Sequence, residues 1–165
     1  MNAIGVMKLS LEMSKSWIMA LVTDMKDAPL TPPTPNGGNH PLWVIGHLTY
    51  SEANLVCEYI KGDANPLKQW KEIFAGGSQP TLDPSRYPPM EEVLARFEQI
   101  RNETMRFIDS LSEEALDKPS HAPNEMKPFF GTVAQCLAAI PIHFAFHGGQ
   151  VADARRAAGR APLMG

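Results

Sequence analysis

The chain has 165 residues, of which 15 are proline, and the placement of these prolines restricts where regular structure can form. Most of them gather in three stretches, at residues 29–35, 80–89 and 119–128. Proline lacks an amide donor and clashes with the preceding helical turn, so such clusters predict connections between elements. Between them lie four segments long enough for helices, at residues 3–26, 41–61, 89–111 and 130–158, with a short helical turn at 112–116.

Within these segments the apolar residues recur at the three- and four-residue spacing of an amphipathic helix. The spacing is clearest in the third segment, at Met90, Val93, Leu94, Phe97, Ile100, Thr104, Phe107 and Leu111. No stretch shows the alternation and β-branched enrichment expected of a strand. The sequence therefore predicts an all-α fold, a four-helix bundle forming one domain over residues 1–165.

The connection between the second and third predicted helices is unusually long. It runs over residues 62–88, about 27 residues, where neighbouring antiparallel helices usually need two to eight. A stretched segment of that length can cross the bundle more than once, so the third helix can run parallel to the second. Trp70, Ile73 and Phe74 are expected to fix this crossover to the bundle, through a short helix.

Charge and composition exclude several classes of protein. A net charge of −3 argues against a broad phosphate-binding surface, so we expect no nucleic-acid partner. No apolar run reaches the length of a membrane span, and the first residues do not resemble a signal peptide, so no membrane partner is expected. Two cysteines are too few for a disulfide framework, which favours a reducing, cytoplasmic location. The small residues Ala152, Ala154, Ala157 and Ala158 suit close packing in a homodimer.

Three of the five histidines fall inside predicted helices. His143 and His147 are four residues apart and therefore share one face of the fourth helix. His47 lies in the second turn of the second helix, and metals in bundle cores are held by side chains from facing helices. The spacing alone is a weak indication, because histidines with ordinary hydrogen bonds would show it too. The apolar flanks, Ile140 and Val151 among them, place the pair on the core-facing side and favour a bound cation.

Three imidazoles are typical ligands of zinc and nickel, with iron or manganese as alternatives. A set of three leaves a coordination position open for water or a substrate, which favours a catalytic type of site over a closed structural one. Tyr50 and Ser51, one turn beyond His47, are placed to reach a water at that position, although ordinary packing explains them equally well. Glu52 is expected to point elsewhere, so no general base is evident.

The remaining histidines and cysteines are assigned structural roles. His40 precedes a proline at the expected start of the second helix, which indicates capping or solvent exposure. His121 lies in a proline-bounded loop, Cys57 is too far along its helix to share a metal with His47, and Cys136 is expected in the core.

Two segments of the chain resemble a known family. HPLWVIGHLTYSE is similar to the tryptophan–x–x–x–histidine start of the second helix in the DinB/YfiT-like superfamily. HFAFHGGQVADARRAAGRAP is similar to the histidine–x–x–x–histidine–x–x–glutamine segment of that family's fourth helix, and the order of the two segments also agrees. The resemblance implies a bundle with a long crossover and a divalent metal held by His47, His143 and His147. Gln150 matches the family's glutamine, a hydrogen-bond partner for a ligand, and Trp43 matches its tryptophan.

The resemblance does not fix a reaction. Some relatives are transferases or isomerases that use a low-molecular-weight thiol, so a transferase or hydrolase acting on a small molecule is the leading hypothesis. The alternative is a non-catalytic, stress-associated bundle protein in which the metal site is structural or empty.

Overall fold

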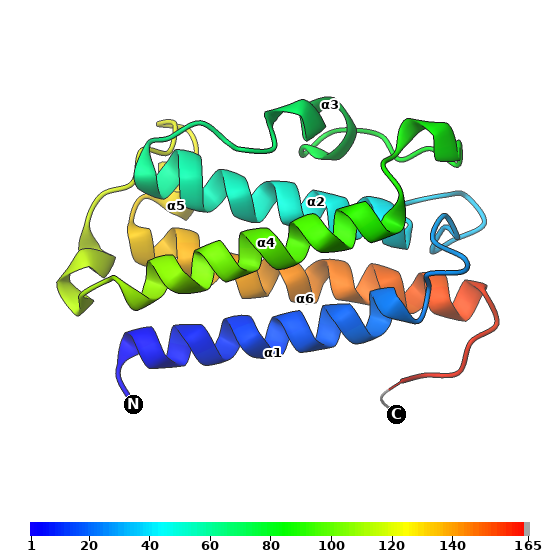
Figure 1. Ribbon diagram of the computed structural model, residues 1–165, viewed down its shortest axis with the longest axis horizontal. Helices are drawn as coiled ribbons and strands as arrows, with labels where there is room; N and C mark the ends of the chain where they lie inside the picture. The colour runs from blue at the N-terminus through cyan, green and yellow to red at the C-terminus, as the bar shows by residue number, and fades with distance from the viewer. Residues whose placement is uncertain (164–165) are drawn as a thin grey trace.

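The computed structural model describes residues 1–163, and within them every regular element is helical. The long helices of Figure 1 are α1 (Ala3–Thr23), α2 (Pro41–Ala53), α4 (Met90–Asp109) and α6 (Val133–Ala157). Short helices join them: η1 (Asn54–Lys61), η2 (Lys68–Trp70), α3 (Lys71–Phe74), η3 (Pro84–Arg86), η4 (Glu113–Asp117) and α5 (Lys127–Phe130). The all-α prediction is confirmed.

The four long helices lie side by side in two parallel pairs. In Figure 1, α2 and α4 run in one direction, whereas α1 and α6 run in the other. Residues 62–89 carry the chain back along the outside of α2, a course that the length of this connection permits. The two histidine-bearing helices, α2 and α6, are therefore antiparallel neighbours.

The second segment differs from the single α-helix predicted for residues 41–61. The α-helix ends at Ala53, and residues 54–61 continue it as a π-helix, η1, whose wider turns bond each residue to the fifth one before it. It ends where expected, at Gly62, which has a φ of 74° and closes the helix in the left-handed region.

The fourth segment begins later than predicted. Its start at Val133, instead of residue 130, is set by a capping box in which the Thr132 side chain accepts from the Gln135 amide and Gln135 bonds back to the Thr132 amide. Residues 127–130 form the separate single turn α5. At the other end, Gly159 follows the helix with a φ of 75°.

The crossover is fixed to the bundle by aromatic side chains, as predicted. Trp70 and Phe74 are buried and pack against each other with ring centroids 5.1 Å apart. Phe74 lies directly over Gly46 of α2, where an added Cβ would be 2.2 Å from the ring. Only glycine permits this approach, so the sequence of α2 accommodates the crossover.

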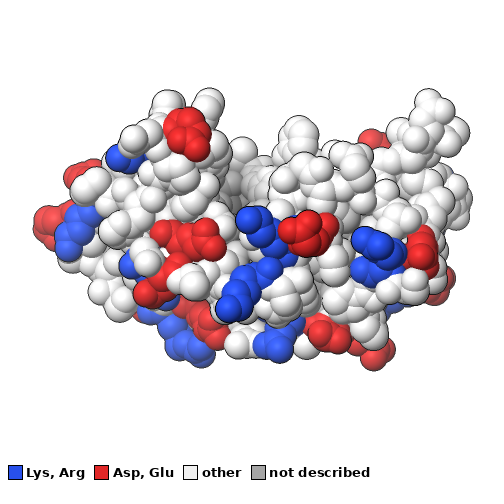
Figure 2. Space-filling view, turned by 90° about the horizontal axis from the view of Figure 1, so that it is seen from above, with Lys and Arg blue, Asp and Glu red and all other residues white. Residues whose placement is uncertain are grey.

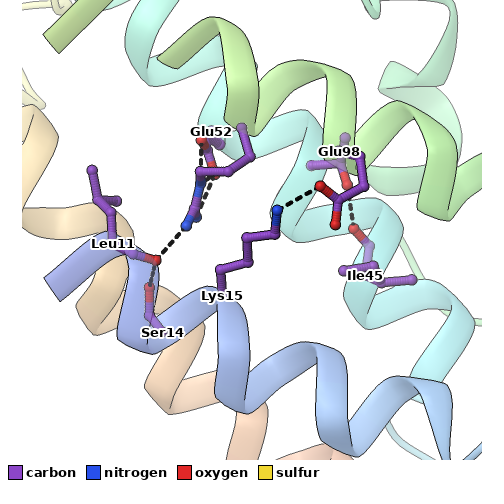
Figure 3. A network of polar contacts seen from close by, with 8 residues as sticks. Leu11, Ser14, Lys15, Ile45, Glu52 and Glu98 are labelled. Carbon is purple, nitrogen blue, oxygen red and sulfur yellow. Dashed lines mark hydrogen bonds and ion pairs between the residues drawn. The ribbon is translucent and has the colours of Figure 1, made fainter. Parts of the chain in front are cut away.

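A buried ion pair joins α2 to α4. Glu52 is 1% exposed and accepts from the equally buried Arg101, with an Nη2–Oε2 distance of 2.8 Å. Arg101 also donates to the carbonyl oxygen of Leu11 in α1, so one guanidinium bonds to two other helices (Figure 3). Figure 3 also shows Lys15 of α1 bonded to Glu98 of α4, a more exposed pair. Glu52 thus points away from the histidines, as expected.

The outer surface over the crossover carries no large patch of only positive or only negative charge. In Figure 2 basic and acidic side chains are interspersed over the lower part of this face, and the upper part carries few charges. Among the described helices none combines the length and the apolar character needed to cross a bilayer.

Candidate metal centre

The structure brings the three predicted histidines together. One ring nitrogen of each of His47, His143 and His147 lies within 4.8 Å of the other two. The Nε2 atoms of His47 and His143 are 3.1 Å apart, and the centroids of the three rings are separated by 4.6–4.9 Å. The rings meet nearly edge to face, so their nitrogens point into a common space between α2 and α6.

Two of the rings are oriented by bonds to their other nitrogen. The Nδ1–H of His47 donates to the carbonyl oxygen of Phe74 at 2.7 Å, and the Nδ1–H of His147 donates to Oε1 of Gln150 at 2.7 Å. A neutral imidazole that donates from Nδ1 keeps a lone pair on Nε2, the form that binds a metal. The contact expected of Gln150 is therefore present.

Residue Asn39 extends this arrangement. Its side-chain amide donates to Oε1 of Gln150 at 3.0 Å, the same oxygen that accepts from His147. The loop before α2 thus helps to fix the side chain of Gln150, which in turn orients the ring of His147 on α6. Asn39 and the Phe74 carbonyl were missed by sequence reasoning, because both lie in connections whose course the helical pattern does not define.

Residue Trp43 packs against the cluster. Its ring stacks on His47 at a centroid distance of 4.6 Å and an interplanar angle of 11°. Its Nε1–H donates to the carbonyl oxygen of Ile73 and to Oγ of Ser78 in the crossover. The indole therefore connects the crossover to the face of a histidine.

Burial keeps all three rings neutral. Loss of solvation, with a smaller contribution from repulsion by neighbouring histidines, lowers the pKa of His47 to about 4 and that of His143 to about 3. Burial also lowers the pKa of His147, against the opposing effect of its bond to Gln150. Near pH 7 the rings are thus unprotonated, as metal ligands must be.

The spacing of one nitrogen pair suits a divalent transition metal. A metal–nitrogen distance of about 2.0–2.1 Å requires ligands about 3.3 Å apart in a tetrahedron and about 2.9 Å apart at right angles. The observed 3.1 Å between the Nε2 atoms of His47 and His143 falls between these values. The donor chemistry and the protonation state of all three histidines, and the spacing of this pair, fit a bound divalent cation.

A cavity of about 900 Å³ opens beside the cluster, and His47 and His143 form part of its wall. Tyr50 and Ser51 line the same cavity, so both predicted neighbours face the space that a substrate would occupy. The other lining residues come from η1, α5, α6 and the segment after α3, and none of those described is charged: Asn54, Leu55, Tyr59, Ala75, Gly76, Met126, Phe129, Phe130, Gln135, Ala138, Ala139, Ile142 and Phe146. The part contributed by residues 126–130 carries no periodic signal and was not predicted.

The residues assigned structural roles lie outside the cluster. His40 caps α2, with its Nδ1 accepting from the amide of Trp43, but it is fully buried and not exposed to solvent. Its Nε2 lies 3.0 Å from the carbonyl oxygen of Thr81, which explains the burial. His121 is exposed, and Cys136 is buried in the core as expected.

Comparison with known proteins gives one match. The family model of the DinB superfamily matches residues 11–151, which include the whole of α2 and all three histidines. Neither the curated proteins nor the solved structures include a significant match to the chain.

Proposed function

The chain belongs to the DinB superfamily, and from this premise we propose that it is a metal-dependent enzyme acting on a small molecule. The observation that carries the proposal is the convergence of three neutral imidazoles beside a large cavity, with two of them, His47 and His143, on its wall. A structural metal site is normally closed by four protein ligands, whereas three ligands beside a cavity leave room for a reactant.

The ligands would be His47, His143 and His147, with zinc or nickel as the cation and iron or manganese as alternatives. A divalent cation held there supplies Lewis-acid activation of a water, a thiol or a carbonyl group. The Phe74 carbonyl and Gln150 fix the ring orientations, and such supporting bonds typically change metal affinity by about 10–100-fold.

Residues Tyr50 and Ser51 are the hydroxyl groups on the cavity wall nearest in sequence to His47. Burial raises the pKa of Tyr50, so its phenol keeps its proton at neutral pH and is suited to donate one to a reacting oxygen. No carboxylate is among the described lining residues, and Glu52 is held by Arg101. A reaction without a carboxylate base suits transfer to a low-molecular-weight thiol, with hydrolysis of a small substrate as the other option.

Metal analysis tests the site directly. We expect about one divalent ion per chain after reconstitution of the wild type, and less than about 0.1 in the His147→Ala variant. His121→Ala is the matched control, because His121 is an exposed histidine outside the cluster. Circular dichroism establishes that each variant is folded. Equal metal content in wild type and His147→Ala would refute the assignment.

A non-catalytic role is the second candidate, and the lack of a carboxylate base in the cavity favours it. In that case the metal would only stabilise the bundle. Turnover of a thiol and an electrophile that disappears both on chelation and in His147→Ala would support the enzyme and exclude this role. Metal-dependent stability with no turnover in such assays would favour the non-catalytic protein.

A further inference from the structure

The cavity beside the histidines has mainly apolar and uncharged walls. None of the described lining residues is lysine, arginine, aspartate or glutamate. Most of the wall consists of aromatic, aliphatic and alanine side chains from η1, α5 and α6. A charged group buried here away from the histidines would have no counter-charge, and burying an unpaired charge is strongly unfavourable.

One polar side chain distant from the histidines is already engaged within the protein. Oε1 of Gln135 accepts from the amide of Thr132 at 3.0 Å, in the cap of α6. The polar groups next to the metal centre are those of Tyr50, Ser51 and the rings of His47 and His143.

The rim of the cavity exposes large apolar side chains. Phe129 is 70% exposed, and Ile142 and Phe146 are each 69% exposed, although all three line the cavity. The ring of Phe129 is 6.5 Å from that of Phe130, whose ring is in turn 5.8 Å from that of Tyr59. These rings provide faces and edges on which an aromatic ligand can pack. Exposed apolar clusters of this kind mark binding sites.

We infer that this cavity binds an uncharged, mainly hydrophobic small molecule, with an aromatic ring or branched alkyl group against Tyr59, Phe129 and Phe130. Its single polar group faces His47 and His143. The volume of about 900 Å³ falls within the range of small-molecule sites, and the hollow shape that reaches the histidines suits such a ligand better than a flat protein partner. The position of the polar group rests on the proposed function, but the binding of the hydrophobic part does not.

Two fluorescent probes that differ by one charge test the inference. N-phenylnaphthylamine is neutral, and anilinonaphthalene sulfonate has the same aromatic skeleton with an added anion. We expect the neutral probe to bind metal-free wild-type protein with at least about tenfold higher affinity than the anionic one. Equal affinities, or a preference for the anion, would overturn the inference.

Substitutions locate the bound probe. Ala138→Trp places a large side chain in the cavity from an exposed position of α6 and is expected to weaken binding of the neutral probe about tenfold or more. Ala95→Trp adds the same side chain at an exposed position of α4 outside the cavity and is expected to leave binding unchanged. Unchanged binding in Ala138→Trp, or an equal loss in Ala95→Trp, would overturn the inference.

Metal content of the same samples separates this inference from the proposed function. The Ala138→Trp variant should keep its metal while losing the probe. His147→Ala should lose its metal while keeping the probe, because His147 is not among the described lining residues. A wild type that binds metal but not the neutral probe refutes only the inference about the ligand. A wild type that binds the probe but no metal refutes only the metal centre.

Discussion

Substitution of Gly46 by alanine is expected to disturb the metal centre without changing any ligand. The added Cβ would lie 2.2 Å from the Phe74 ring, where ordinary contacts begin at 3.4 Å, so the ring must move by more than 1 Å. The ring is fully buried against Trp70 and Tyr87, so it has little room to do so. Displacing Phe74 also displaces the carbonyl that accepts from His47.

The expected loss of stability follows from two opposing terms. Overpacking of a filled core costs about 1–3 kcal/mol, and a contact this short lies at the upper end, near 3 kcal/mol. Alanine in place of glycine inside a helix contributes about 1 kcal/mol of stabilisation. Gly46→Ala is therefore expected to lower the free energy of unfolding by about 2 kcal/mol. Loss of the bond that orients His47 should weaken metal binding by about 10–100-fold.

Urea denaturation and metal competition with a chelating dye measure the two effects. Gly149→Ala in α6 is the matched control, because an added Cβ there meets nothing within 4 Å and should stabilise the helix by about 1 kcal/mol. The double variant Gly46→Ala/Phe74→Leu should lose less stability than the sum of the losses in the two single variants, because the smaller side chain partly relieves the clash. If Gly46→Ala behaves like Gly149→Ala, the crossover does not pack on α2 as described.

Three further predictions follow from the buried polar contacts. Glu52→Gln breaks a fully buried ion pair and should lower the free energy of unfolding by about 3–5 kcal/mol, whereas Glu98→Gln, whose pair is partly exposed, should cost less than about 1 kcal/mol in the same urea assay. Gln150→Leu should weaken metal binding about 10–100-fold in the dye assay while the protein stays folded; unchanged affinity would show that the bond does not support the site. The pKa values of His47 and His143 are lowered in the folded state, so the unfolded chain binds more protons as the pH falls below about 6.5, and metal-free protein should lose thermal stability between pH 6.5 and pH 4. A melting temperature that rises across that interval would contradict this sign.

Sequence reasoning reached the parts of the site that depend on helical periodicity. The pairing of His143 with His147 follows from a fixed geometry, and Gln150 lies one turn beyond, so their common face was predictable. Predicting that His47 joins this pair required knowing which helices face each other. Its sequence context indicated that it faces the core, and the family resemblance supported the pairing.

The parts that escaped prediction depend on the path of non-repeating backbone. The carbonyl of Phe74 has no side-chain signature, and the approach of its ring to Gly46 appears only once the crossover is folded. The change from α- to π-helix after Ala53 likewise leaves no clear mark in the apolar pattern.

The cytoplasmic location and the homodimer stay predictions. Size-exclusion chromatography with light scattering tests the second, for which Val6 and Trp17, half-exposed on α1, offer apolar surface.

The neighbouring positions of α1 and α6 have a consequence for the order of folding during synthesis. The first helix packs mainly along the last one, from which it is separated by more than 100 residues. On the ribosome, α1 emerges with Leu11, Ile18 and Val22 uncovered and has no access to this partner until α6 has been translated. His143 and His147 emerge equally late, so a nascent chain cannot assemble the three-histidine cluster early. Docking of α6 onto the other helices therefore closes the core and completes the three-histidine cluster in the same event.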